Sequence, residues 1–175
     1  MSPPRSAPAV HHYRSSARWS GSTGAGYDHS DRSHLATTDP PTVELDLSSD
    51  PAFGGDAARL DPEQLLVTAA VSCQLLSFLA VAARARLDVI AYADDAEAVM
   101  PETDRPVRIT RITMRPRITV AVPHSDGPEA EATVVANVRR LVEVAHRQCF
   151  IANSLRSEIV IEPAITVIDD TPERP

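Results

Sequence analysis

A run of 20 residues without a formal charge, from Gln64 to Ala83, limits what this chain can fold into more than any other stretch. Its length alone equals that of a membrane-spanning helix. Polar and thiol side chains interrupt the run, however, and no second run of this kind exists in the chain. A helix buried in a core or in a dimer interface therefore accounts for the run better than a membrane span does.

The residues just before this run are typical of a helix N-terminus. Asp61 can cap the first turn, Pro62 fits the first helical position, and Glu63 places a carboxylate in that turn. We therefore expect one long helix from Pro62 to about Arg86.

Shorter patterned segments surround this helix. A second amphipathic helix is expected over 128–148, and a short helical turn through Asn153 and Ser154. Alternating or β-prone segments predict strands at 13–20, 27–37, 43–47, 88–99, 107–122 and 157–167. The alternation changes phase within 107–122, which predicts a β-bulge near Thr110 or Arg111. This order of elements predicts an α+β fold with helices on one side of antiparallel sheet.

Composition narrows the possible surroundings and partners. A net charge of −7 and a pI of about 5.3 argue against nucleic acid as a partner. Two cysteines are too few for a secreted disulfide scaffold, and the N-terminus lacks a signal peptide's apolar segment. We expect one domain over 12–169, a disordered tail at 1–11 and a second tail at 170–175, in a reducing cytoplasm. The charged residues Arg108, Arg111, Arg115 and Arg117 are expected to form a solvated strand face rather than a ligand face.

Two cysteines, Cys73 and Cys149, lie in the two helical segments. Each could be a small buried side chain, because free cysteine is among the most buried residue types. A reactive thiol needs a nearby cation or donor. The uncharged run offers none to Cys73, so an activating arginine must come from elsewhere, whereas His146 and Arg147 lie within a turn of Cys149. A zinc site with His146, or Cys–His acyl transfer, remains an alternative.

Two motifs resemble those of the OsmC/Ohr family of bacterial organic hydroperoxide reductases. One is Asp-Pro-Glu-Gln-Leu-Leu at 61–66, followed by Ser72-Cys73; the other is His-Arg-Gln-Cys-Phe-Ile-Ala-Asn-Ser-Leu at 146–155. The likeness extends from about Arg18 to the last strand. It implies an OsmC-like fold, with antiparallel sheets packed around long central helices in an intertwined homodimer, and with two active sites at the subunit interface.

The resemblance also implies roles for particular residues. Cys73 would be the peroxidatic cysteine, Cys149 the resolving cysteine and Glu63 the acidic residue. Tyr-Asp-His-Ser-Asp-Arg-Ser-His at 27–34 looks like a stretch in a related subgroup and nominates Arg32 as the arginine, with Arg59 as the second choice. No metal, flavin or haem is implied.

Helix geometry adds a condition on the acidic residue. Ten residues separate Glu63 from Cys73, a rise of about 15 Å, so the two side chains of one helix cannot touch. Glu63 must therefore act from a second chain or through an intermediary. Two copies of the helix crossing antiparallel near Thr68 would bring Glu63 of one copy near Cys73 of the other.

The resulting expectation is a thiol-dependent peroxidase that reduces organic hydroperoxides to alcohols. Cys73 would become a sulfenic acid, Cys149 would close a disulfide with it, and an external dithiol, a lipoyl protein or a small thiol, would reduce the disulfide. The alternative is a non-enzymatic structural or small-ligand-binding dimer with inert thiols. The chain departs from the family pattern at Asp61, Gln74 and Phe150. These departures bear on which hydroperoxides it would accept and not on the thiol chemistry.

Overall fold

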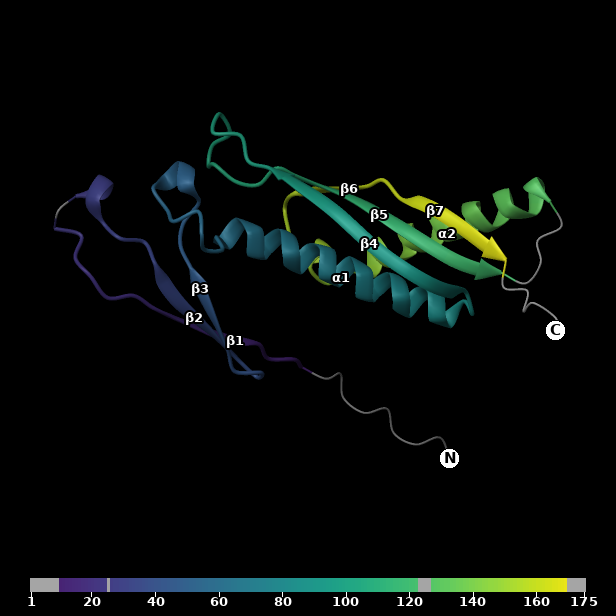
Figure 1. Cartoon of the computed structure of the whole chain (residues 1–175), viewed down its shortest axis with the longest axis horizontal. Coiled ribbons are helices and arrows are strands. Elements are labelled where there is room, and N and C mark those ends of the chain that lie inside the picture. Colours follow the sequence, from purple (N-terminus) through teal and green to yellow (C-terminus); the bar gives the residue numbers. More distant parts are fainter. Residues whose placement is uncertain (1–9, 25, 123–126, 170–175) are drawn as a thin grey trace. The chain divides into compact units, whose positions relative to one another are not determined.

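The computed structural model describes residues 10–24, 26–122 and 127–169 (Figure 1). The chain divides into two compact units, Met1–Gln64 and Leu65–Pro175. Both expected tails fall largely or wholly outside the described residues, so the disorder predicted for 1–11 stays a prediction. The assignment of 12–169 to one domain likewise stays a prediction.

The N-terminal unit contains a three-stranded antiparallel sheet, ordered β1 (Arg14–Arg18), β2 (His34–Asp39), β3 (Val43–Leu47). Two 3-10 turns, η1 (Tyr27–His29) and η2 (Pro51–Phe53), lie between and after the strands. The strand predicted at 27–37 is therefore wrong in its first half, because residues 27–29 turn before β2 begins. Within the described part of this unit, the buried residues are Leu47, Ser48 and Asp61.

The C-terminal unit holds a four-stranded sheet and most of the helical structure. Its elements are α1 (Pro62–Arg84), which begins at the unit boundary, β4 (Asp88–Val99), β5 (Arg111–Val122), α2 (Pro128–Gln148), the 3-10 turn η3 (Ala152–Ser154), β6 (Glu158–Ile161) and β7 (Ala164–Asp169). β4 pairs with β5 antiparallel, whereas β6 and β7 both run parallel to β5. The α+β prediction is confirmed, with a sheet that is mixed.

Two details of the predicted strands are wrong. The single final strand is divided at Glu162 and Pro163, because proline has no N–H for the sheet and fixes the backbone angle φ. The register shift lies between Val89 and Ala91 in β4 and not near Thr110, since β5 begins only at Arg111.

Both helices of the C-terminal unit cover one face of its sheet (Figure 1). Alternate β5 residues, including Ile118 and Val120, point into the core and are almost completely buried. The helices contribute Phe78, Val81, Ala82, Val138, Leu141, Val142 and Ala145 to the same cluster. A second cluster surrounds Ala70, Ile112 and Met114. This packing holds the middle of α1 against the C-terminal end of α2.

Arginines on and beside the other face of β5 all pair with carboxylates. Arg108 pairs with Asp104, Arg111 with Glu158, Arg115 with Glu97 and Glu162, and Arg117 with Asp95. Exposed pairs of this kind contribute little to stability. They neutralise the basic stripe and agree with its interpretation as a solvated face.

Helix α1 begins as expected and ends slightly earlier. The Gln64 N–H donates to Asp61 Oδ1 at 2.7 Å, and the Gln64 side chain accepts from the Asp61 N–H at 3.3 Å, a reciprocal capping box. After Arg84, Arg86 adopts a left-handed conformation with φ 57°. The Leu87 N–H then bonds to the Ala82 carbonyl at 3.0 Å, which closes the helix end.

Much of the apolar surface of α1 is left uncovered within the C-terminal unit. Among the described residues, α1 is the one helix that is long and apolar enough to cross a membrane. Within its most apolar 18-residue window, 28% is buried. Leu76 is 63% exposed and Leu79 is 39% exposed. Exposed apolar surfaces of this kind mark protein–protein, membrane or ligand contact sites.

Candidate functional site

The structure brings Cys73 and Cys149 together. Cys73 lies half-buried in the middle of α1, and Cys149 lies at the C-cap of α2, 1% exposed. Both are free thiols, and they lie close enough for each to shift the pKa of the other. The packing of α1 and α2 on one face of the sheet produces this proximity of residues 76 positions apart in the sequence.

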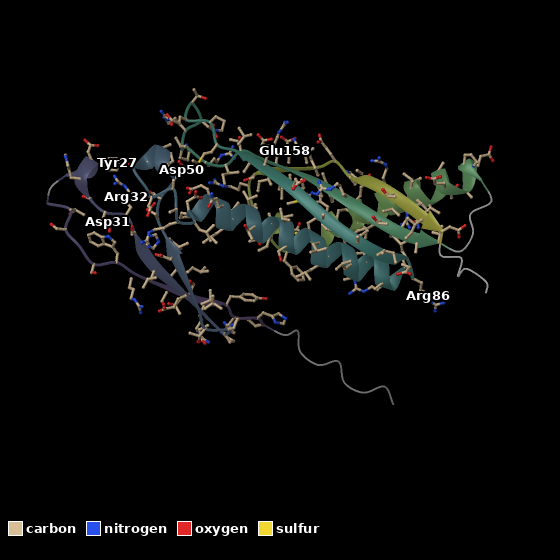
Figure 2. All side chains as sticks on the ribbon, in the orientation of Figure 1. Tyr27, Asp31, Arg32, Asp50, Arg86 and Glu158 are labelled. Atoms are coloured by element: carbon tan, nitrogen blue, oxygen red, sulfur yellow. The ribbon has the colours of Figure 1, made fainter. Side chains whose placement is uncertain are left out.

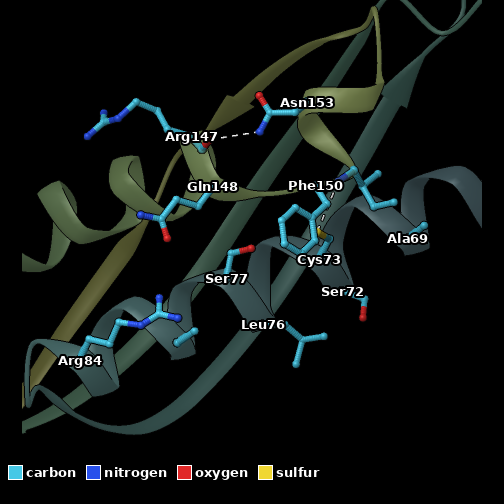
Figure 3. Close-up of a pocket in the computed structure, with 12 residues that line it drawn as sticks. Ala69, Ser72, Cys73, Leu76, Ser77, Arg84, Arg147, Gln148, Phe150 and Asn153 are labelled. Atoms are coloured by element: carbon cyan, nitrogen blue, oxygen red, sulfur yellow. Dashed lines mark hydrogen bonds between the residues drawn. The ribbon is translucent and has the colours of Figure 1, made fainter. Parts of the chain in front are cut away.

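Backbone donors surround the Cys73 sulfur. The Ile151 N–H donates to Cys73 Sγ at 3.5 Å (Figure 3). Burial raises the pKa of the Cys73 thiol, but the Ile151 N–H, the Cys149 thiol and the Phe150 N–H outweigh it, so this pKa lies below its ordinary value. The Ser77 hydroxyl, one turn further along α1, adds to the lowering.

Cys149 has the opposite bias. Burial raises the pKa of the Cys149 thiol, and the neighbouring Cys73 raises it further, against a lowering by the Ala152 N–H, which donates to Cys149 Sγ at 3.4 Å. As pH rises, Cys73 therefore loses its proton before Cys149 does. The two thiols thus differ in acidity although they are neighbours.

The turn that supplies these donors is held by side-chain hydrogen bonds. Asn153 Nδ2 donates to the Cys149 carbonyl at 2.8 Å and to the Arg147 carbonyl at 3.1 Å (Figure 3). Ser154 Oγ donates to the Phe150 carbonyl at 2.8 Å. The sequence predicts a helical turn here but does not identify its N–H groups as donors to Cys73, because backbone atoms leave no residue-specific signal.

A cavity of about 780 Å³ opens beside Cys73 (Figure 3). Its apolar lining includes Leu76, Phe150 and Ile151, and its two arginines are Arg84 and Arg147. Arg147 is recognisable in the sequence as a neighbour of Cys149, whereas Arg84 was not predicted to belong to the site. The helical spacing of Cys73, Ser77 and Arg84 along one face of α1 is a signal that could have found it.

Arg32 belongs to the N-terminal unit, where it lies beside Tyr27 (Figure 2) and is held by a cage of backbone carbonyls. Its guanidinium donates to the carbonyls of Ser30, Gly54 and Tyr27 at 2.8, 3.2 and 2.7 Å, and lies 4.3 Å from the centre of the Tyr27 ring. Gly54 makes this approach possible, since its φ is 76° and a Cβ there would meet Arg32 Nη1 at 3.0 Å. These partners orient the cation without neutralising it.

Arg59, the second choice, has different partners. It forms ion pairs with Asp46 and Asp56, the latter at 3.1 Å. Two carboxylates therefore neutralise Arg59, whereas Arg32 has no ion pair within the described residues. An anionic or electron-rich ligand would find more uncompensated charge at Arg32.

Glu63 lies half-buried in the first turn of α1. Because α1 is continuous from Pro62 to Arg84, the separation of about 15 Å from Cys73 along the helix holds. The structure thus brings together the two cysteines, and it places Glu63 and Arg32 in the N-terminal unit. Among the described residues, no group of three or more His, Cys, Asp or Glu side chains could hold a metal ion.

Comparisons with known proteins agree with this arrangement. A family model for OsmC-like proteins matches residues 54–164, which include both cysteines and Glu63. The search of curated proteins found no match.

Solved structures share the fold. An OsmC-like protein from Vibrio cholerae is 24% identical, with a TM-score of 0.75 over 89% of this chain and 100% of that one. The organic hydroperoxide resistance protein OsmC from Legionella pneumophila is 19% identical, with a TM-score of 0.59 over 91% of this chain and 100% of that one. OhrB, the organic hydroperoxide resistance protein of Bacillus subtilis, is 18% identical, with a TM-score of 0.55 over 90% of this chain and 100% of that one.

Proposed function

The chain belongs to the OsmC-like protein family, and from that premise we propose that it is a thiol peroxidase that reduces organic hydroperoxides to alcohols. One observation carries the proposal: two neighbouring free thiols, with pKa values shifted in opposite directions, beside a largely apolar cavity. Two fold relatives described as organic hydroperoxide resistance proteins are consistent with it.

In the proposed first step, the Cys73 thiolate attacks the hydroxyl oxygen of the hydroperoxide ROOH. The O–O bond breaks, a sulfur–oxygen bond forms, and the leaving alkoxide takes a proton to become the alcohol. Cys73 is then a sulfenic acid. The apolar lining at Leu76, Phe150 and Ile151 suits an organic R group better than it suits hydrogen peroxide.

In the second step, Cys149 attacks the sulfenic sulfur of Cys73. A disulfide forms and the sulfenic oxygen leaves as water. The proximity of the two thiols, each of which shifts the pKa of the other, supports closure of this disulfide. An external dithiol, a lipoyl protein or a small thiol, would then restore both thiols by exchange, as a reducing cytoplasm would allow.

Arg32 and Glu63 have proposed roles as well. Arg32 would bind the peroxide oxygens, a role supported by its oriented and uncompensated charge. Glu63 would orient that arginine. The lowered pKa of Cys73 has its sources in its own unit, at Ile151, Cys149, Phe150 and Ser77, so the arginine is not required for it.

A homodimer would complete this site, and the uncovered face of α1 supports one. The face consists of uncharged residues at helical spacing: Thr68, Ala69, Ser72, Leu76, Leu79, Ala80 and Ala83. We expect sedimentation to give a dimer at micromolar concentration, and Leu76→Arg to weaken it, because the substitution buries a charge. Ile168→Arg, at a 40% exposed position of β7, is the control. A stable wild-type monomer would contradict the dimer.

Titration of the reduced protein with one equivalent of tert-butyl hydroperoxide tests the peroxidase proposal. We expect an intramolecular Cys73–Cys149 disulfide, seen by mass spectrometry as the loss of two hydrogens. Cys149→Ser should still consume one equivalent and stop at a sulfenic acid or form disulfide-linked dimers. Peroxide consumption by Cys73→Ser as fast as by the wild type would refute the assignment. Inert thiols in the wild type would favour a non-enzymatic ligand-binding dimer.

A further inference from the structure

A second cavity, of about 340 Å³, lies between the C-terminal half of α2 and the strand β6. It is lined by Arg139, Val142, Glu143, His146, Arg147, Ile159, Ile161 and Pro163. Arg147 is the residue that also lines the thiol cavity; the other seven do not. The thiol chemistry therefore leaves most of this cavity unused.

The lining of the second cavity carries net positive charge. Arg139 and Arg147 contribute two positive charges and Glu143 one negative charge, which leaves a formal charge of +1 with His146 neutral. Neither arginine forms a salt bridge within the described residues.

His146 adds unused hydrogen-bonding capacity to the same wall. Its Nδ1 is inaccessible to solvent and has no hydrogen-bond partner in the described part of the chain. An unsatisfied buried polar atom is unfavourable and rare in native proteins. If the imidazole of His146 reoriented and formed a hydrogen bond with an oxygen of a ligand, the unfavourable free energy of the unpaired nitrogen would be removed.

The helix dipole explains part of this charge but not all of it. His146 and Arg147 lie in the last turn of α2, where basic side chains stabilise the helix end. Arg139 lies two turns earlier, beyond the range of that effect. Arg139, His146 and Arg147 all line the cavity, whereas only His146 and Arg147 lie at the helix end. The cavity is therefore the feature that the three basic side chains share.

The opposite side of the cavity is apolar. Val142 is buried, and Ile159, Ile161 and Pro163 are half-buried around the space. A volume of 340 Å³ lies at the lower end of the range for small-molecule sites, roughly 300–1,000 Å³. A ligand that fills it needs an apolar body of modest size and one anionic group.

We propose that this cavity is a binding site for a small organic acid. The carboxylate lies between Arg139 and Arg147, with His146 as an additional partner, and the apolar body rests on Ile159, Ile161 and Pro163. Glu143 limits the site to ligands with a single negative charge, because a second one would lie against its carboxylate. The site is independent of the proposed peroxidase activity.

An NMR titration of the reduced, full-length protein tests the proposal, with 4-phenylbutyrate as the probe and 4-phenylbutan-1-ol as its uncharged counterpart. We expect shifts centred on the amides of Val142, His146, Ile159 and Ile161, and binding of the alcohol weaker by about tenfold or more. Arg139→Gln should weaken binding of the acid by about tenfold, since it removes a charge-assisted bond. Arg139 is the better choice for substitution than Arg147, which lines both cavities.

The adjacent arginine provides a matched control. Arg140 donates to Asn137 at 3.0 Å and does not line the cavity, so Arg140→Gln makes the same charge change outside the site. We expect its affinity for the acid to stay within about twofold of the wild type, the size of an unspecific charge effect at physiological salt. Equal losses in the two variants would overturn the proposal. So would shifts confined to the thiol cavity, or equal affinity for the acid and the alcohol.

Discussion

Around Arg32 the N-terminal unit is held by polar contacts, whereas around the two thiols the C-terminal unit is a packed core. Arg32 depends on three carbonyls and the Tyr27 ring. Cys73 and Cys149 depend on the burial of α1 and α2 against β5, where Phe78, Val120 and Val138 are fully buried. Substitutions in the two regions should therefore have different effects. Replacing the proposed cation, Arg32, should change the reaction rate alone, whereas substitutions around the proposed nucleophile, Cys73, should change the free energy of unfolding as well.

The largest expected effect is on rate and concerns Arg32. We expect Arg32→Ala to lower kcat/KM for tert-butyl hydroperoxide by roughly ten- to a thousandfold, about 1.4–4 kcal/mol of transition-state stabilisation. The loss of an exposed polar contact should change stability far less. Peroxide kinetics and urea unfolding of Arg32→Ala beside Arg59→Ala check this. A large loss in Arg59→Ala with none in Arg32→Ala would move the role to Arg59.

The next effect is on stability and compares one valine from each unit. Val138 is 0% exposed in the core, and Val43 is 45% exposed in β3. We expect Val138→Ala to lower the free energy of unfolding by about 2 kcal/mol, from lost apolar burial and the cavity left behind, and Val43→Ala by less than about 1 kcal/mol. Urea unfolding of both variants measures the difference. Equal losses would mean that a partner covers the N-terminal sheet.

A third prediction concerns pH and separates the thiol from the arginine. Because the folded-state pKa of Cys73 is lowered and that of Cys149 is raised, iodoacetamide should modify Cys73 at a lower pH than an ordinary thiol and Cys149 at a higher pH. Mass spectrometry across a pH series gives both midpoints. The Cys73 midpoint should stay low in Arg32→Ala, since its donors lie in its own unit. A rise to the ordinary value would show that the units are electrostatically coupled at the thiol.

The smallest effect compares two left-handed backbone positions, one in each unit. Arg86 has φ 57° where glycine is favoured, so Arg86→Gly should raise the free energy of unfolding by about 0.5–1 kcal/mol. Gly54→Ala should act in the opposite sense and also lower peroxidase activity, because its methyl group would press on Arg32. Urea unfolding of both, with kinetics of the second, checks the signs. Stabilisation by Gly54→Ala would contradict the cage described for Arg32.

Local patterns in the sequence determined much of the fold. The capping residues before the uncharged run predicted the start of α1, and the bounds of β3, β4 and α2 agree with the segments predicted at 43–47, 88–99 and 128–148. Hydrophobic periodicity and capping act within a few residues, so one sequence suffices to detect them. The same local reasoning failed at residues 27–29 and at Pro163, where turn chemistry and a missing N–H interrupt a β-prone stretch.

Tertiary structure alone decided the site. The sequence by itself, with its family resemblance, identified Cys73, Cys149, Glu63 and Arg32 as candidates. It could not supply the proximity of two thiols 76 residues apart, which depends on two helices packing on one sheet face. Nor could it identify the Ile151 N–H as a donor to Cys73, because every residue except proline carries such a group and only the fold directs it.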